Sequence, residues 1–206
     1  MRLKIISILF VLVWVVFVPK NSFSANIGQS FKDSYRYEKM GAYKDAIRCL
    51  LPIQKEYPKF YLVNLRLGWL YYLYGKYANS ISYYEKALQL RPNSFEALLG
   101  LSLPLMAQKR WSRVESLMNR LISMDPYNYY GNLRLAISLR LQNKANLAEK
   151  VMRKMLLRYP SSVLFWVELG RDLWWQGKNE QARNVFKKVL LLDPENVVAR
   201  GMLQKL

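Results

Sequence analysis

The sequence contains no histidine, and Cys49 is its one cysteine. Without histidine, neither a Ser-His-Asp nor a Cys-His arrangement can be built, and a zinc site loses its commonest nitrogen ligand. A single cysteine excludes a disulfide within the chain, and Cys49 is best interpreted as a small apolar side chain rather than a reactive thiol. The phosphate-binding pattern G-x-x-x-x-G-K-[ST] is also absent. We therefore expect no enzyme activity, no catalytic residue, no metal ligand and no cofactor.

Long apolar runs are absent too, except for residues 5–18, which follow two basic residues. These 14 residues would span about 21 Å as a helix, less than the roughly 30 Å of a bilayer core. A basic start, a short apolar centre and a polar stretch with small residues are typical of a secretory signal peptide. We predict that residues 1–24 are this signal, cleaved after Ser24, and that the protein is exported to the periplasm. Secretion and an uncleaved membrane anchor are the alternatives.

Five prolines that follow apolar runs lie 34 residues apart, at Pro58, Pro92, Pro126, Pro160 and Pro194. Proline lacks an N–H and clashes with the preceding turn, so five stops at one spacing indicate five copies of one helical unit. The predicted repeats are 27–60, 61–94, 95–128, 129–162 and 163–196, with a C-terminal cap at 197–206. Residues 25–206 would then form a single domain.

The fifth unit carries a W-L-G, A, F, P pattern through Trp166, Leu169, Gly170, Ala182, Phe186 and Pro194. The second unit matches through Leu67, Gly68, Tyr71, Gly75, Ser80, Tyr84, Ala87 and Pro92. This pattern resembles the tetratricopeptide repeat, and the resemblance extends over 170 of the 206 residues. It implies an all-α, right-handed superhelical solenoid of five helix pairs with a short C-terminal helix and a concave inner face. The RNA-reading pentatricopeptide repeat has a longer period, which argues against it.

The residue types at equivalent positions have physical reasons of their own. Small residues in the first helix would let the two helices of a pair approach closely, namely Ser34, Gly68, Ser102, Ala136 and Gly170. The facing positions in the second helix are Ala46, Ser80, Val114, Ala148 and Ala182, and larger apolar residues follow one turn later at Leu50, Tyr84, Met118, Met152 and Phe186. Stacked pairs of this kind should bury one continuous core. The turn between the helices has Gly41, Gly75, Asn143 and Gly177, which suit a left-handed conformation, whereas the third unit has Lys109 there.

The first helix of each pair would line the concave face with apolar and aromatic side chains. Large exposed patches of this kind mark interaction sites; the alternative is that the stripe is partly core packing. The predicted groove residues are Phe31, Tyr35, Leu65, Trp69, Tyr72, Leu99, Leu103, Met106, Leu133, Ile137, Arg140, Val167, Arg171, Trp174 and Trp175. Some tetratricopeptide domains hold a partner's terminal carboxylate with Lys, Asn and Arg, but the equivalent places here are apolar, so that activity is not expected.

These features favour an exported bacterial scaffold of the cell envelope that holds a partner protein or peptide in the groove. Aromatic anchors would supply most of the affinity, as they commonly do at interfaces. The alternative is a polysaccharide- or cell-wall-binding module in envelope biogenesis or polysaccharide export, because aromatic faces also stack on sugars. Sugar sites usually add acidic or amide groups beside the rings, and this groove has few of them.

Acidic residues are scarce, since 14 Asp and Glu stand against 32 Lys and Arg, and residues 25–206 keep a net charge of +15. Many basic residues fall on second helices, which would form the outer face: Lys109, Arg110, Arg113, Arg120, Lys150, Arg153, Lys154, Arg158, Lys178, Arg183, Lys187 and Lys188. We expect this face either to be simply solvated or to contact an anionic membrane or polymer. Nucleic acid is not an expected partner, because an exported protein rarely meets it.

Pro104 lies inside the first helix of the third unit, where a proline costs about 3 kcal/mol and clashes with the carbonyl four residues back. That residue is Gly100, which has no side chain to hinder a bend. The sequence therefore suggests either a local kink that alters the groove or a tolerated substitution in an irregular unit.

Overall fold

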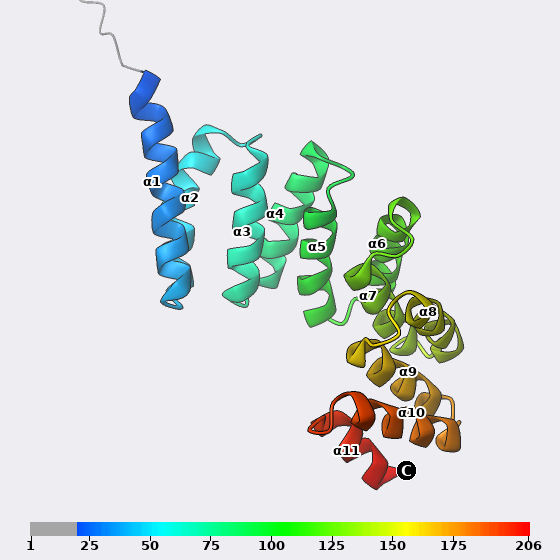
Figure 1. The fold of residues 1–206 in the computed structure, drawn as a ribbon. Helices are drawn as coiled ribbons and strands as arrows, with labels where there is room; N and C mark the ends of the chain where they lie inside the picture. Colours follow the sequence, from blue (N-terminus) through cyan, green and yellow to red (C-terminus); the bar gives the residue numbers. More distant parts are fainter. Residues whose placement is uncertain (1–19) are drawn as a thin grey trace, which may run out of the picture.

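The computed structural model describes residues 20–206, and in this part of the chain it contains helices and no strands (Figure 1). The all-α fold class is thus confirmed. The helices are α1 (Lys20–Lys39), α2 (Tyr43–Glu56), α3 (Tyr61–Leu73), α4 (Tyr77–Leu90), α5 (Phe95–Ala107), α6 (Trp111–Met124), α7 (Tyr129–Arg140), α8 (Ala145–Arg158), α9 (Val163–Trp175), α10 (Asn179–Leu192) and α11 (Val197–Lys205).

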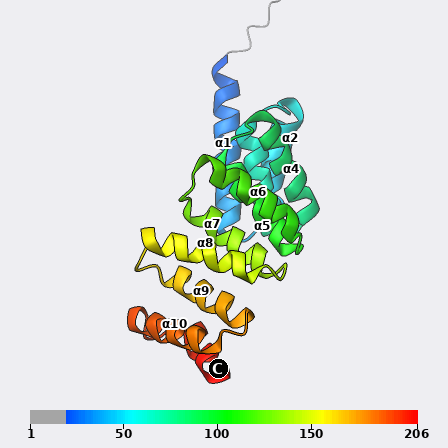
Figure 2. The ribbon, with the colours of Figure 1, turned by 90° about the vertical axis from the view of Figure 1, so that its right-hand side faces the viewer.

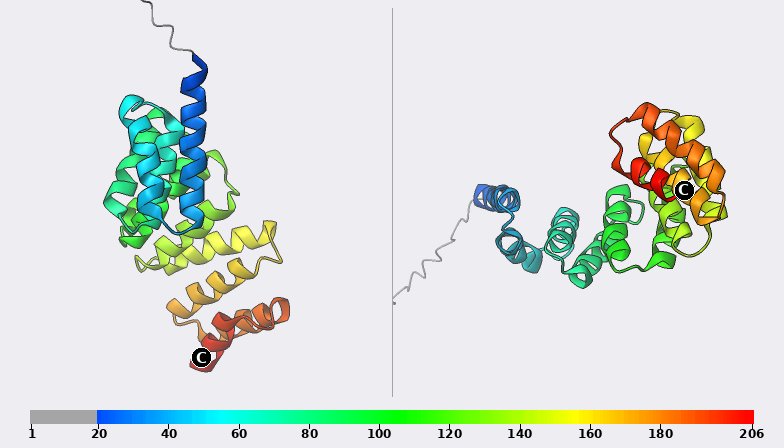
Figure 3. Two further views of the ribbon diagram at one scale, coloured as in Figure 1. Left: turned by 90° about the vertical axis from the view of Figure 1, so that its left-hand side faces the viewer. Right: turned by 90° about the horizontal axis from the view of Figure 1, so that it is seen from below.

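Each helix packs against the next one along the chain, and the first helices of successive pairs also touch, α3 with α5, α5 with α7 and α7 with α9. The early helices stand in a row, after which the chain turns and the later helices stack beneath them (Figures 1 and 2). Seen from below, the helix pairs follow an arc (right panel of Figure 3). The chain is a superhelical solenoid, and the contacting first helices form its inner face.

The helix boundaries follow the predicted period. From residue 61 onward, each predicted unit begins at the first residue of its first helix, and each periodic proline lies two residues beyond its second helix. From the second unit onward, the last residue of each unit caps the next helix, because its side-chain oxygen accepts the amide N–H three residues on. These caps are Ser94, Asn128, Ser162 and Asn196.

The turns within the helix pairs share one backbone conformation. Gly41, Gly75 and Gly177 have positive φ of 70°, 73° and 74°, and Asn143 has 61°. Lys109 also adopts a left-handed φ of 55°. The third unit therefore departs from the others in residue type but not in backbone shape, and Lys109 bears the strain that glycine avoids.

The predicted packing of small residues against large ones is observed. The ring of Tyr84 lies where a Cβ atom on Gly68 would need to be, with its Cγ 2.8 Å from that point, and Phe186 stands in the same relation to Gly170. A Cβ atom on Gly100 would be only 2.3 Å from Tyr84 Cε1. Gly100 is therefore needed to accommodate Tyr84, which is a different reason from the one that the sequence suggested.

The apolar interior is less continuous than the repeat pattern predicts. Besides a small cluster of Tyr61, Ala87 and Ala97, buried residues of α2 and α3 form one cluster, and buried residues from α4 to α11 form another. Trp69, itself only partly buried, packs against both of them. The two clusters are thus joined through Trp69, a side chain on the inner face, whereas the first helix pair is linked to α3 by the buried residues of the first cluster.

Helix α5 continues through Pro104 without interruption, and Pro104 is buried. The amide of Gln108 donates to the Pro104 carbonyl at 3.1 Å, so the last turn of the helix is also formed. Among the two alternatives for this segment, the unbroken helix favours a tolerated proline.

Most of the predicted signal peptide lies outside the described residues. Its predicted cleavage point, after Ser24, falls within α1. Among residues 26–206, whose side chains the structure describes, the buried ones extend from Ser34 to Ala199. Between residues 20 and 206, no helix has both the length and the apolar character needed to cross a bilayer.

Candidate functional site

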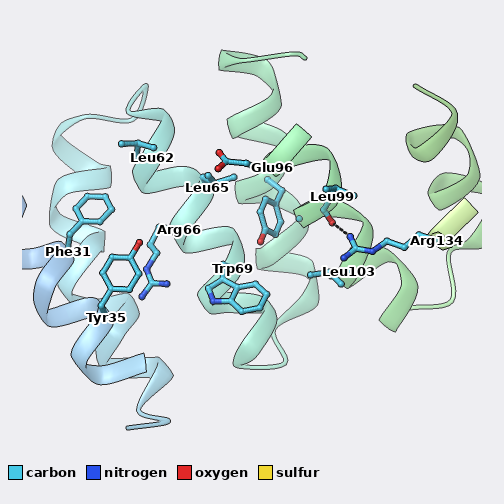
Figure 4. Close-up of a pocket in the computed structure, with 12 residues that line it drawn as sticks. Phe31, Tyr35, Leu62, Leu65, Arg66, Trp69, Glu96, Leu99, Leu103 and Arg134 are labelled. Carbon is cyan, nitrogen blue, oxygen red and sulfur yellow. Dashed lines mark hydrogen bonds between the residues drawn. The ribbon is translucent and has the colours of Figure 1, made fainter. Parts of the chain in front are cut away.

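The inner face contains a hollow of about 470 Å³ between α1, α3 and α5 (Figure 4). Its lining repeats along the solenoid: Leu65 and Trp69 of α3 are followed 34 residues later by Leu99 and Leu103 of α5. This regularity arises because adjacent first helices present the same positions to one face. The full lining is Phe31, Tyr35, Leu62, Leu65, Arg66, Trp69, Tyr84, Glu96, Leu99, Gly100, Leu103 and Arg134.

The predicted groove residues that line this hollow are Phe31, Tyr35, Leu65, Trp69, Leu99 and Leu103. The ring of Tyr72 lies 5.7 Å from that of Trp69 and extends the aromatic surface beyond the hollow. Sequence reasoning missed Leu62, Arg66, Tyr84, Glu96, Gly100 and Arg134. Leu62 and Arg66 could have been found, since they lie one helical turn from Leu65 and Trp69 on the same stripe.

Four side chains tie α1 to α3 at one end of the hollow. Arg66 forms an ion pair with Glu38, and Glu38 also accepts the indole N–H of Trp69 at 2.7 Å. The guanidinium carbon of Arg66 lies 3.7 Å from the ring centroid of Tyr35, a cation–π arrangement. Because Arg66 is nearly buried and paired, its charge is compensated locally, and these contacts hold both aromatic rings in place.

The other end of the hollow is closed by Arg134 of α7. Its Nη1 donates to the Leu99 carbonyl at 2.5 Å and to Ser102 Oγ at 2.6 Å, and Figure 4 shows it reaching α5 from the neighbouring helix. Burial lowers the pKa of Arg134. Within residues 26–206, no carboxylate forms an ion pair with it, so its charge is uncompensated at the edge of the hollow.

Tyr84 reaches the hollow from α4, behind the inner layer. It is buried because Gly68 and Gly100 leave room for its ring. Burial raises the pKa of Tyr84, so the phenol stays neutral at ordinary pH. The bottom of the hollow is therefore an uncharged aromatic surface.

The remaining predicted groove residues lie elsewhere. Leu133 and Val167 are buried, so they are core residues and the prediction that they line an open groove is wrong for both. Met106 and Ile137 are partly buried against the core. Trp174 and Trp175 are exposed at the end of α9, with ring centroids 6.3 Å apart, and they do not contribute to the hollow.

Arg140, also predicted to line the groove, is instead the centre of a buried ion-pair network. Its Nη2 lies 2.5 Å from Glu168 Oε2 and its Nη1 lies 2.6 Å from Asp172 Oδ1. Arg171 contacts the other oxygen of Glu168 at 2.7 Å, so this predicted residue belongs to the same network. Burial raises the pKa of Asp172 to about 7, although Arg140 opposes that shift. Between α7 and α9, the inner face is therefore occupied by the ion pairs of Arg140 with Glu168 and Asp172 and not by an open apolar groove.

No group of side chains suited to metal binding occurs among the described residues. Cys49 is partly buried, and burial is the main reason that its thiol pKa is raised, with Asp33 and Asp45 adding to the effect. A raised pKa makes the thiolate scarce, so Cys49 is a poor nucleophile. The hollow itself presents apolar surface and the N–H donors of Arg134.

Comparison with protein families gives two matches, both to models described as tetratricopeptide repeat. One covers residues 63–94 and the other covers residues 131–162. These segments correspond to the second and fourth predicted units, and both matches stop at the last residue of the unit. No curated protein matches the chain in sequence.

Several solved structures share the fold. MamA residues 41 to the end, from Desulfovibrio magneticus RS-1, align with a TM-score of 0.76 and 18% identity, over 84% of this chain and 97% of that one. TTC0263, a thermophilic TPR protein in Thermus thermophilus, aligns with 0.64 and 14%, over 86% and 97%. YrrB, described as a TPR protein with an unusual peptide-binding site, aligns with 0.74 and 11%, over 91% and 99%. The two matched segments are thus tetratricopeptide repeats, and the chain as a whole has the fold of these solved structures.

Proposed function

We propose that the protein is a non-enzymatic scaffold that binds a segment of a partner protein in the hollow between α1, α3 and α5. The observation that carries the proposal is the hollow itself, a concave surface of about 470 Å³ whose lining is mainly aliphatic and aromatic. Exposed apolar surfaces of this kind favour association. The peptide-binding site named for YrrB, which has the same fold, supports a peptide as the occupant.

The lining also indicates which segment would fit. Leu62 and Tyr35 are 48% and 51% exposed, so they offer open apolar surface to an incoming chain. Arg134 has spare N–H groups and no acidic partner in the described chain, so a segment with apolar side chains and a hydrogen-bond acceptor would satisfy it. Among the lining residues, Glu96 is the one acid and no amide side chain occurs. This composition favours a protein segment over a polysaccharide.

We further propose that the scaffold acts in the bacterial cell envelope, most simply in the periplasm. Support comes from the signal-like layout of residues 1–24, and the first buried side chain among residues 26–206 is Ser34. Removal of the signal would leave the hollow intact, since its first lining residue is Phe31. Contact of the basic outer face with an anionic membrane or polymer would not involve the hollow and does not form part of this proposal.

The chain offers a matched pair of variants to test groove binding. Leu62 and Leu164 occupy the same position of their repeats and are 48% and 40% exposed, but only Leu62 lines the hollow. Peptides selected from a random display library on the wild-type protein should lose binding to Leu62→Asp and keep it with Leu164→Asp. Selected peptides that bind both variants as they bind the wild type would show that the hollow is not the binding site.

A further inference from the structure

A second surface lies on the outer side of the C-terminal repeats. Leu157 of α8 and Leu191 of α10 are 88% and 84% exposed, the highest values among the large apolar side chains of the described residues. They occupy the same position of successive repeats, where the first three units have Lys55, Gln89 and Ser123. An outward leucine is therefore specific to the last two units rather than a property of the repeat.

Each of these leucines follows a pair of basic residues by one helical turn. The sequence R-K-M-L-L at residues 153–157 is matched by K-K-V-L-L at residues 187–191. We call residues 150–158 of α8 together with residues 181–191 of α10 the outer strip. The strip contains seven Lys and Arg and no Asp or Glu. Its charge is thus of one sign around the exposed leucines.

The two parts of the strip are joined by Trp166 of α9, the helix that lies between α8 and α10 (Figure 2). Trp166 borders a shallow hollow beside Leu157. On its other side, Lys188 Nζ of α10 lies 3.9 Å from the centroid of the Trp166 ring. The strip is therefore one surface, with tryptophan, leucine and lysine side by side.

Several of the charges in this strip are uncompensated. Lys150, Arg158 and Lys187 are exposed and form no ion pair or hydrogen bond within the described residues. Others are partly engaged, since Arg153 pairs with Glu149 and Lys154 donates to the Pro126 carbonyl. A partner of this strip must therefore supply negative charge and also accept leucine side chains.

We propose that the outer strip binds the surface of an anionic lipid bilayer. Basic residues are attracted to the negative potential of such a surface, and leucine and tryptophan side chains enter the boundary between headgroups and acyl chains. A soluble polyanion would use the charges but would gain nothing from Leu157 and Leu191. A bilayer also suits the outer face of a solenoid, because it offers a broad surface rather than a segment that needs a groove.

The test uses residues 25–206, the predicted mature chain, because the apolar run at residues 5–18 would itself bind any bilayer. This chain contains every buried side chain of the described structure. Flotation with vesicles of phosphatidylcholine alone, and with added phosphatidylglycerol, measures binding. The wild type should bind the anionic vesicles and not the neutral ones. No binding to anionic vesicles, or equal binding to both kinds, would overturn the proposal.

Two pairs of variants separate the apolar contribution to vesicle binding from the electrostatic one. Leu157→Ser with Leu191→Ser should weaken binding to anionic vesicles about tenfold, while Met40→Ser, at a site 69% exposed on the first pair, should have no effect. Lys150→Gln with Lys187→Gln should also weaken binding to anionic vesicles about tenfold. The control is Lys44→Gln with Lys55→Gln on α2, which removes the same charge outside the strip and should weaken that binding less. Circular dichroism checks that each variant remains helical. If the double serine variant does not, Leu157→Ala with Leu191→Ala takes its place.

Dextran sulfate serves as a polyanion without a bilayer. The double leucine variant should bind it as the wild type does, because only charge is involved. If that variant also binds anionic vesicles like the wild type, the contact is purely electrostatic and the proposal is wrong. The strip does not overlap the hollow, so Leu62→Asp should leave vesicle binding unchanged, and failure of either proposal is independent of the other.

Discussion

The ring of Tyr84 occupies the space that a side chain at Gly100 would need, with Cε1 only 2.3 Å from the position of a Cβ atom. Tyr84 belongs to α4 and Gly100 to the next unit, so this contact joins two repeats. It also sets the shape of the hollow, because both residues line it.

We predict that Gly100→Ala destabilises the protein by about 1–3 kcal/mol, the usual cost of overpacking. Gly201→Ala is the matched control, because it also lies inside a helix but a Cβ atom there meets nothing within 4 Å. That variant should be unchanged or up to about 1 kcal/mol more stable, owing to the helix propensity of alanine. Urea unfolding of both variants measures the difference, and equal stabilities would contradict the assigned role of Gly100.

Much of the fold could be predicted from the sequence because it depends on local features that repeat. Proline, the capping Ser or Asn and the turn glycine act within a few residues, so their spacing gives the helix boundaries. One contact recurs along the repeats without a recurring residue type. The side chain six residues after the periodic proline donates to the carbonyl of that proline, at Asn64, Asn132, Trp166 and Arg200. Three residue types, Asn, Trp and Arg, serve this one role, so residue type alone did not indicate it.

The candidate site was harder to predict because two of its lining residues come from outside α1, α3 and α5. Tyr84 reaches it from a second helix and Arg134 from the following unit, and neither contact follows from a stripe on one helix. Arg140 was placed in the groove by its position in the repeat. Its burial depends on Glu168 and Asp172 lying one turn apart on the neighbouring helix, a pair that stands out in a chain with so few acids.

Trp69 has a structural role in addition to its place in the hollow, since it packs against both apolar clusters. We therefore predict that Trp69→Ala lowers the free energy of unfolding by about 2 kcal/mol or more. Trp175→Ala, at a site 45% exposed, should change it by less than about 1 kcal/mol. Thermal unfolding followed by circular dichroism compares them. Similar losses for both variants would mean that Trp69 does not link the clusters.

Acid should weaken the hydrogen bonds and ion pairs that surround Glu149 of α8. Burial alone would raise the pKa of Glu149, but hydrogen bonds from Lys178, Arg153 and Gln176 outweigh it and lower that pKa to about 2. Because the folded pKa is depressed from 4.5, the stabilisation is present above pH 4.5 and is lost as pH falls towards 2.

Glu149→Gln should consequently cost about 1 kcal/mol at pH 7, since the cluster is partly open to solvent, and much less near pH 2. Urea midpoints at several pH values measure this, with Glu85→Gln, in an exposed pair with Arg113, as the control. If Glu149→Gln is destabilised relative to the wild type as much near pH 2 as at pH 7, the titration of Glu149 is not the cause of the loss.

The signal-peptide interpretation predicts that the exported protein begins at Ala25. Cleavage there would shorten α1 at its start, well before Ser34, the first buried side chain among residues 26–206. We therefore expect residues 25–206 to unfold at the same urea concentration as the full chain. N-terminal sequencing of exported material identifies the first residue. A full-length chain that stays in membranes after an alkaline wash would instead indicate an uncleaved anchor.

Arg140 neutralises two carboxylates that are almost fully buried, Glu168 and Asp172. Arg140→Met should therefore destabilise the protein by about 3–5 kcal/mol, because it leaves charge without compensation. The triple variant with Glu168→Gln and Asp172→Asn should recover much of that loss, since neutral groups of the same shape need no cation. If the triple variant is no more stable than Arg140→Met, the loss reflects packing around the arginine stem rather than charge.

The same network should give the Arg140→Met variant a characteristic pH dependence. Burial raises the folded pKa of Asp172 from 3.8 to about 7, so the folded state holds this proton better than the unfolded state does, and the stability contribution of Asp172 falls as pH rises through that interval. Without Arg140, which favours the ionised form, the folded pKa of Asp172 should rise further. The deficit of Arg140→Met relative to the wild type should then be larger at pH 8 than at pH 5. Urea unfolding at both pH values measures the two deficits, and equal deficits would rule out an ionised Asp172 as the source of the instability.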